Sequence, residues 1–186
     1  QMTAPVWMRG ILDDQYGIKS DEIRWRSGGQ EEAGRDERTP FVAPEGLDLE
    51  PIPEDRTLVE MFEAGELDAL TTAREPSSYS LRKPNIDRLF PEFRSVEKGY
   101  FRDTNIFPIM HLMGLRKDLA DKHPWLAGSL YKAFVEARDI AYEDIAKTAA
   151  LSVALPWVAQ ELQDTVQLMG ADYWRYGIEE CRHEIE

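Results

Sequence analysis

The sequence has 186 residues, of which 42% are hydrophobic and 31% are charged, and its formal net charge is −13. This length suits one domain of ordinary size or two small lobes, and the apolar content is sufficient for a core. The acidic balance argues against a nucleic-acid partner, which would require a basic surface, and against adhesion to an anionic membrane. Any anionic ligand must therefore be held by a local group of arginines.

Cys181 is the single cysteine of the sequence. It cannot form an internal disulfide, and a zinc site built from several thiolates is excluded. The sequence contains no apolar run of about 18 residues, so we expect no transmembrane helix. Because the chain begins Gln1-Met2 and enters a helix start at once, we expect it to be a fragment of a longer protein.

The first stretch has the pattern of an amphipathic helix over residues 5–16. Thr3 is a suitable N-cap, Pro5 falls in the first turn and Gly17 is a natural end. The free N–H groups at a helix start attract anions, and Arg9, about one turn further on, can add a guanidinium. Two interpretations stay open, a carboxylate site at Thr3 and Arg9 or an ordinary capped helix with a surface arginine.

The next elements predict a small α/β lobe. Residues 22–27, 47–52 and 67–73 have the composition and alternation of strands. Between the last two, Thr57 begins a capping box for a helix over residues 58–63. Helices packed on a sheet follow from this order of elements.

The connection after the first strand, residues 28–39, is long, charged and rich in glycine. Loops of this length in compact domains are usually functional or disordered. Gly28-Gly29 would let the backbone approach a ligand closely, and Arg35 and Arg38 could turn toward it. A solvated loop with no ligand is the alternative interpretation.

Residues 74–79 follow the third predicted strand. Ligands of open α/β sheets bind beyond the carboxyl ends of strands, so Arg74 and Ser77 are candidate ligand contacts. A surface turn with a salt bridge is the alternative. Short helices are then predicted over residues 85–90, capped by Asn85, and over residues 92–101.

The apolar run over residues 104–116 predicts a buried strand that carries His111. A lone histidine in such a strand is more often a packed core residue than a catalyst. An imidazole nevertheless exchanges protons near neutral pH, which makes His111 a candidate acid or base.

The rest of the chain reads as helices with one aromatic loop. Pro124 begins a long helix with an apolar stripe, to which no chemistry is assigned. The predicted ranges are 118–121, 125–148 and 156–169 for the helices and 172–177 for the loop.

Several catalytic motifs are absent, namely the glycine-rich nucleotide loops and the serine nucleophile elbow. His123 and His183 lack a second histidine at metal-ligand spacing, so no metal site is predicted. The remaining cationic and hydroxyl groups at element ends fit the capture of a small mono- or dicarboxylate.

Taken in order, several short motifs resemble the 4,5-dihydroxyphthalate decarboxylase family over nearly the whole chain. The matching stretches are Thr3-Ala-x-x-Trp7-x-Arg9-Gly10, Tyr16-Gly17, Gly28-Gly29, Gly34-Arg35, Glu37-Arg38, Leu67-Asp-Ala-Leu70 with Arg74, Leu89-Phe90-Pro91, Phe107-Pro-Ile-Met-His111 and His123-Pro124-Trp125.

The resemblance implies an α/β fold of the type 2 periplasmic-binding-protein kind, with a ligand cleft between two lobes. Residues 1–103 would form the second lobe, and residues 104–186 would return to pack with the first lobe. Thr3 and His111 would then face one cleft from opposite sides.

The resemblance also implies a function, the non-oxidative loss of CO2 from a hydroxylated aromatic dicarboxylate, for which no cofactor is expected. His111 would be the acid/base, and the substrate-binding residues would be Thr3, Arg9, Arg35, Arg74 and Ser77. The expected partner is a small aromatic or organic carboxylate, and neither a nucleic acid nor a membrane is an expected partner. The expected location is the cytoplasm, and a homo-oligomer is possible. The alternative is a periplasmic solute-binding protein that delivers an organic anion to an ABC transporter.

Overall fold

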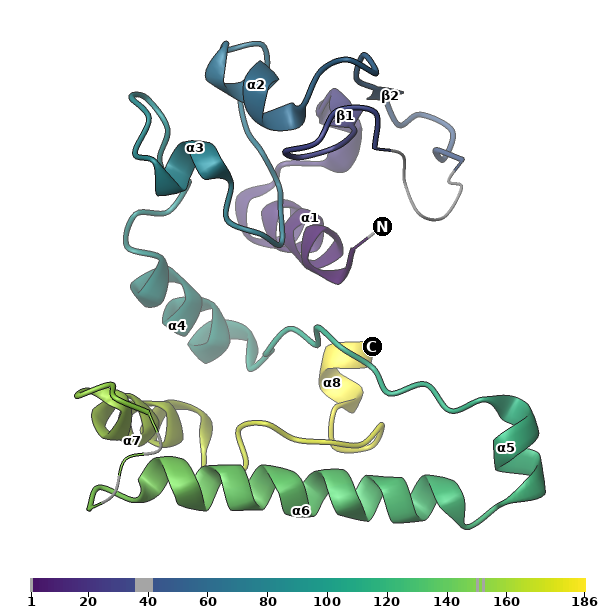
Figure 1. Cartoon of the computed structure of the whole chain (residues 1–186), viewed down its shortest axis with the longest axis vertical. Coiled ribbons are helices and arrows are strands. Elements are labelled where there is room, and N and C mark those ends of the chain that lie inside the picture. Colours follow the sequence, from purple (N-terminus) through teal and green to yellow (C-terminus); the bar gives the residue numbers. More distant parts are fainter. Residues whose placement is uncertain (1, 36–41, 150, 152) are drawn as a thin grey trace. The chain divides into compact units, whose positions relative to one another are not determined.

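The computed structural model describes residues 2–35, 42–149, 151 and 153–186. The chain divides into two compact units, Gln1–Pro91 and Glu92–Glu186, and each is described by itself. The elements of both are labelled in Figure 1. Arg38, a candidate ligand contact, lies outside the described residues.

The first unit opens with helix α1, Thr3–Tyr16, which confirms the helix predicted there. Gly17 ends it in the left-handed conformation with φ of 68°, and its N–H donates to the Asp13 carbonyl oxygen at 2.9 Å. The predicted cap is wrong, because Met2 is the N-cap residue and Thr3 is already helical. Pro5 remains in the first turn, where its missing N–H costs no hydrogen bond.

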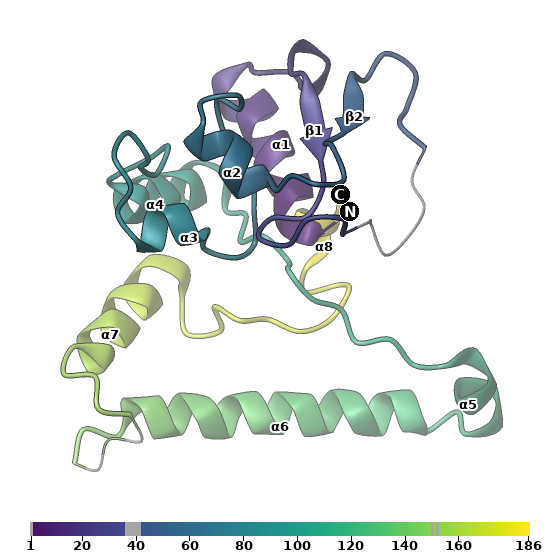
Figure 2. The ribbon, with the colours of Figure 1, turned by 45° about the horizontal axis from the view of Figure 1, so that its top comes forward.

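Two of the predicted strands form and pair in parallel, as Figure 2 shows. Strand β1, Trp25–Ser27, follows a short 3-10 turn at Ser20–Glu22, and strand β2 is Leu49–Pro51. The register pairs Trp25 with Leu49. Pro51 ends β2, since proline cannot donate to a further ladder bond.

The core of the first unit lies between β2 and helix α2, Leu58–Glu63, whose predicted capping box is confirmed. The Glu60 N–H donates to the Thr57 hydroxyl at 3.1 Å, and the Thr57 N–H donates to the Glu60 carboxylate at 3.0 Å. Ile52 and Val59 are the buried apolar side chains, and Thr57 is buried with them.

Two other predictions for this unit are wrong. Residues 67–73 form no strand, because a strand requires a neighbour and the segment is instead held by side-chain hydrogen bonds of Thr72. Residues 85–90 form no helix, since Asn85 has φ of 65°, which is incompatible with the extended backbone of an N-cap. A short helix that was not predicted, α3, spans Ser77–Ser80.

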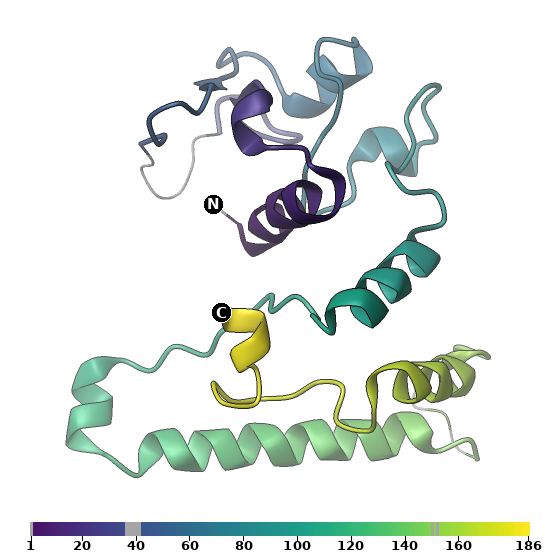
Figure 3. The same ribbon diagram turned by 180° about the vertical axis from the view of Figure 1, so that it is seen from behind.

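The second unit is helical in its described residues. It consists of α4 (Phe93–Thr104), α5 (Lys117–Lys122), α6 (Leu126–Ala146), α7 (Val158–Met169) and α8 (Arg182–Ile185). The predictions of α4 to α7 are confirmed. After α7, the chain runs back along α6 to α8, as Figures 1 and 3 show.

The buried strand predicted over residues 104–116 is wrong. From Asn105 to Arg116 the backbone has neither helix nor strand, and Leu112 and Met113 are 91% and 66% exposed. None of the described residues of this unit forms a strand with which this run could pair. An apolar run becomes a buried strand only where such a partner exists.

The chain therefore has mostly helices and one small parallel sheet. Its accessible surface is 14355 Å², whereas two separate compact proteins of half this length would expose roughly 11,000 Å² in all. Much apolar surface is correspondingly exposed in both units. Among the described helices, none has the length and apolarity needed to cross a membrane.

Candidate functional site

The loop that follows β1 is held close to the core by two glycines. A Cβ at Gly29 would lie 1.8 Å from the Glu32 carbonyl oxygen, and a Cβ at Gly28 would lie 2.4 Å from Ile52 Cγ1. The Gly29 carbonyl oxygen accepts a hydrogen bond from the Leu58 N–H at 2.9 Å. The predicted close approach at these glycines is thus an approach of the loop to its own unit.

Two side chains of this loop bind the segment that carries Arg74 and Ser77. The Gln30 amide donates to the Arg74 carbonyl oxygen at 3.3 Å and accepts from the Thr72 hydroxyl. The Glu31 carboxylate accepts from the Ser77 N–H at 2.8 Å and from the Ser77 hydroxyl at 2.7 Å. Segments more than 40 residues apart in sequence therefore meet beyond the carboxyl end of β1.

At the Glu31–Ser77 contact, the donors of Ser77 hold the carboxylate of Glu31. Partial burial alone would raise the pKa of Glu31, but the hydrogen bonds from Ser77, with a smaller one from Gln30, outweigh it and lower the pKa. The N–H and hydroxyl of Ser77 thus already stabilise a carboxylate, which belongs to the protein's own chain.

The structure brings three of the predicted binding residues into one neighbourhood. Arg35 belongs to the same loop, where its Cβ would lie 3.1 Å from a Cβ at Gly29, and its guanidinium pairs with Glu32 at 3.4 Å. Arg74 is exposed, and among the described residues no carboxylate pairs with its guanidinium. Ser77 thus makes the contact with Glu31, Arg74 lies three residues before Ser77, and Arg35 lies four residues after Glu31.

The two candidates on α1 lie elsewhere in this unit. Thr3 is exposed at the first position of the helix. The Arg9 guanidinium carbon stacks 5.8 Å from the centre of the Trp25 ring, and the Trp25 indole N–H donates to the Ser20 carbonyl oxygen at 2.8 Å. Arg9 thus contacts the residue that begins β1, whereas the loop of Arg35 follows the strand's end.

His111 belongs to the second unit and lies exposed in the run after α4. Within the described part of that unit, no hydrogen bond reaches its imidazole. It is therefore not the buried core histidine that the apolar run suggested as an alternative. The prediction that it shares a cleft with Thr3 stays a prediction.

A second cluster, which was not predicted, is centred on Arg138 in the middle of α6. Its side chain is 14% exposed and donates to Asp172 at 2.7 Å and to the Trp174 carbonyl oxygen at 3.1 Å. Its guanidinium carbon also lies 5.6 Å from the ring centres of Tyr142 and Tyr176. These contacts fasten the predicted aromatic loop to α6.

The electrostatics of this cluster agree with a structural role. A hydrogen bond to Asp139 raises the pKa of Arg138 against the opposing effect of burial, and the charge of Asp172 adds to the increase. Burial raises the pKa of Tyr142, which stacks on Tyr173 at 4.8 Å. The signal in the sequence was the spacing of Phe134, Arg138 and Tyr142, which places an arginine on the apolar face of a helix.

A third cluster involves Arg175, Cys181 and Glu184. Arg175 Nη2 lies 2.7 Å from Glu184 Oε1, and the Glu184 side chain is only 4% exposed. Glu184 Oε2 is buried and has no hydrogen-bond partner among the described residues. Burial, followed by the charge of Glu184, raises the pKa of Cys181, so the thiol stays protonated at neutral pH and is a poor nucleophile.

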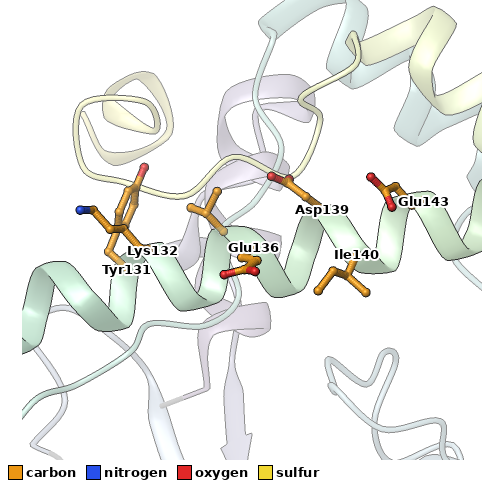
Figure 4. Close-up of a pocket in the computed structure, with 7 residues that line it drawn as sticks. Tyr131, Lys132, Glu136, Asp139, Ile140 and Glu143 are labelled. Atoms are coloured by element: carbon orange, nitrogen blue, oxygen red, sulfur yellow. The ribbon is translucent and has the colours of Figure 1, made fainter.

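A hollow of about 430 Å³ runs along α6, but its chemistry does not suit a carboxylate ligand. Figure 4 shows that its lining residues all project from this one helix. Glu136, Asp139 and Glu143 line it against a single cation, Lys132. An organic dianion would be repelled there. No cluster of three or more potential metal ligands occurs in the described part of the chain.

Comparison with known proteins gives the same family that the motifs suggested. No family model matches the chain. All 186 residues align at 37% identity with 4,5-dihydroxyphthalate decarboxylase of Comamonas testosteroni, over 56% of that protein. A stretch of 102 residues aligns at 34% identity with 4,5-dihydroxyphthalate decarboxylase of Pseudomonas putida, over 40% of that protein.

The resemblance to 4,5-dihydroxyphthalate decarboxylases is therefore confirmed over the full chain. The chain spans about half the length of the curated relatives that it matches.

Proposed function

We propose that this chain forms part of a carboxy-lyase that removes CO2 from a hydroxylated aromatic dicarboxylate such as 4,5-dihydroxyphthalate. The observation that carries the proposal is the similarity of all 186 residues to 4,5-dihydroxyphthalate decarboxylase of Comamonas testosteroni. The same proposal includes a type 2 periplasmic-binding-protein fold, with residues 1–103 in the second lobe and residues 104–186 returning to the first. It also includes a cytoplasmic location.

The geometry of the first unit supports a carboxylate ligand. Both donors of Ser77 hold the Glu31 carboxylate, so a substrate carboxylate would bind there in place of Glu31. Arg74 is exposed, and Arg35 belongs to the same loop as Glu31. Charge-assisted hydrogen bonds of this kind hold an organic acid in a fixed orientation. Under the proposal, Thr3 and Arg9 add further contacts to the substrate.

The reaction needs little from the protein besides orientation and a proton. A hydroxyl para to the departing carboxylate loses its proton and donates electron density to the ring, while the carbon that bears the carboxylate takes up a proton. The carbon–carbon bond then breaks, its electron pair restores the aromatic ring and CO2 leaves. The phenolate finally regains a proton, so the net change is one proton consumed for each CO2 released.

His111 is the proposed proton-transfer residue. Its imidazole is exposed, and histidine is the side chain that enzymes use most often for proton transfer. General acid–base catalysis of this kind contributes about 10²- to 10⁴-fold. His111→Gln should therefore lower kcat by about 10²-fold or more and leave substrate affinity within a fewfold range.

The test incubates the full chain with 4,5-dihydroxyphthalate and follows CO2 and 3,4-dihydroxybenzoate. His123→Gln is the matched control, because His123 ends α5 and has no proposed role in the reaction. Binding of the acid without turnover would refute the enzyme and support the solute-binding alternative. Full turnover by His111→Gln would refute the role of His111 and leave the reaction itself standing.

A further inference from the structure

The segment that follows α7 packs on the run that carries His111, within the second unit. The rings of Phe107 and Trp174 meet edge to face with centres 5.4 Å apart. Nε2 of His183 lies 2.8 Å from the Thr104 carbonyl oxygen. Two stretches about 70 to 80 residues apart in sequence are thereby joined at two points.

Arg175 directly follows Trp174 in the chain, and its guanidinium is bound by one carboxylate. One N–H of its guanidinium is used by Glu184, and its side chain remains 36% exposed. Within the described part of the chain, no second carboxylate pairs with it. A guanidinium carries five donors in a planar fork that matches a carboxylate, so Arg175 can bind one through the donors that remain.

Glu184 gives independent evidence that this cluster is incomplete. Its Oε2 is buried, and no donor among the described residues reaches it. Buried carboxylate oxygens almost always accept a hydrogen bond, so Oε2 can still accept one from a donor that the described residues do not supply. A phenolic hydroxyl is such a donor.

The aromatic pair supplies a surface for a ring. Phe107 is 39% exposed and Trp174 is 50% exposed, although both are large apolar side chains that touch each other. An exposed aromatic ring and a guanidinium on consecutive residues suit a planar aromatic acid, which stacks on the ring and places its carboxylate on the cation.

We propose that Arg175, oriented by Glu184, and the Phe107–Trp174 pair form a subsite that binds an aromatic carboxylate. The choice of an aromatic acid rests on the proposed function. The Cα of His111 lies within about 14 Å of that of Phe107, because four residues of chain span no more. The subsite therefore lies within reach of the run that carries the proposed acid/base.

The test uses phthalate, a diacid without hydroxyls, as the probe and the full chain as the protein. Affinity is measured by isothermal titration calorimetry. Arg175→Gln should weaken phthalate binding by about tenfold or more, because it removes a charged hydrogen bond to the ligand. Arg175→Lys keeps the ion pair with Glu184 but not the fork, and should weaken binding by about threefold or more.

Arg182→Gln is the matched control, because Arg182 is exposed and already paired with Glu179 and Glu186. It should bind phthalate within twofold of the unchanged chain. Fluorine NMR of the chain labelled with 5-fluorotryptophan adds a readout of position. The variant Trp174→Phe identifies the resonance of Trp174. Phthalate should shift this resonance and leave the resonance of Trp157, which is 74% exposed, in place.

Wild-type affinity in Arg175→Gln or in Arg175→Lys would overturn the subsite, and so would a failure of the unchanged chain to bind phthalate. Equal shifts at Trp157 and Trp174 would overturn it as well. Binding at Trp174 without release of CO2 from 4,5-dihydroxyphthalate would refute the proposed reaction and leave the subsite standing. Release of CO2 by Arg175→Gln at the wild-type kcat/KM would refute the subsite and leave the proposed reaction standing.

Discussion

Arg138 and Arg94 offer a matched test of how burial controls the strength of an ion pair. Both arginines lie on helices of the second unit, and both pair with a carboxylate, Asp172 at 2.7 Å and Glu161 at 2.8 Å. The Arg138 side chain is 14% exposed and that of Arg94 is 66% exposed. Substitution of each by Met keeps most of the aliphatic stem and removes the charge.

The expected magnitudes follow from the contacts of each guanidinium. For Arg138, loss of the charged hydrogen bond to Asp172 costs about 1.5 kcal/mol or more, and the Trp174 carbonyl bond and the contacts with two tyrosine rings add to this. We expect Arg138→Met to destabilise the second unit by about 2 to 3 kcal/mol. Arg94→Met removes one exposed pair and should cost less than about 1 kcal/mol.

The assay is hydrogen exchange of the two variants and the unchanged chain, read at α6 and at residues 172–177. Arg138→Met should speed exchange in both regions, since the aromatic loop loses its attachment to the helix. Arg94→Met should leave both regions close to the unchanged protein. Equal effects of the two substitutions would refute the reasoning, because the argument depends on their difference in exposure.

Three further predictions concern other residues. Gly29→Ala should destabilise the first unit by about 2 kcal/mol or more in urea unfolding, because the new Cβ would clash with the Glu32 backbone. Gly10→Ala is the control, since Gly10 lies inside α1 with open space around it, and this substitution should stabilise the first unit by about 0.5 to 1 kcal/mol. Glu31→Gln should destabilise the same unit at pH 7. Because folding lowers the pKa of Glu31, the stability that its carboxylate contributes is present above the unfolded pKa of about 4.3 and is lost as the pH falls through the folded pKa. An equal effect of the substitution at pH 2 and pH 7 would contradict this prediction. The raised pKa of Cys181 predicts slow alkylation by iodoacetamide at pH 7 with a rate that still rises above pH 9, and Glu184→Gln should lower that pKa by removing a nearby negative charge.

The sequence predicted the elements whose signals are local. The capping box at Thr57, the left-handed glycine that ends α1 and the helical spacing of α6 each act within a few residues, and each is confirmed. The strands predicted over residues 67–73 and 104–116 depend on a partner far away in the chain. Composition alone cannot supply that partner, so these two predictions were wrong.

The candidate site divides in the same way. Arg74 and Ser77 were chosen for their place after a predicted strand, and that strand does not form, yet both residues still lie beyond the carboxyl end of β1. What brings them there is the pair Gln30 and Glu31, more than 40 residues earlier. No local sequence pattern predicts a hydrogen bond between residues that are so far apart in the chain. The clusters of Arg138 and Arg175 were not predicted for the same reason, because the partners of these arginines lie on other segments.

Although the net charge is −13, the arginines differ in how far carboxylates already balance their charge. Arg182 is shared by two carboxylates, and Arg138 also contacts two, so the positive charge of each is already balanced. Arg175 has one carboxylate, and Arg9 stacks on Trp25 with none among the described residues. Under the proposed function, a substrate dianion binds most readily where a guanidinium keeps unused donors. Among the residues proposed to bind substrate, Arg9, Arg35, Arg74 and Arg175 meet this condition, since each pairs with at most one carboxylate among the described residues. We predict that each contributes more to the affinity for 4,5-dihydroxyphthalate than Arg182 or Arg138 does.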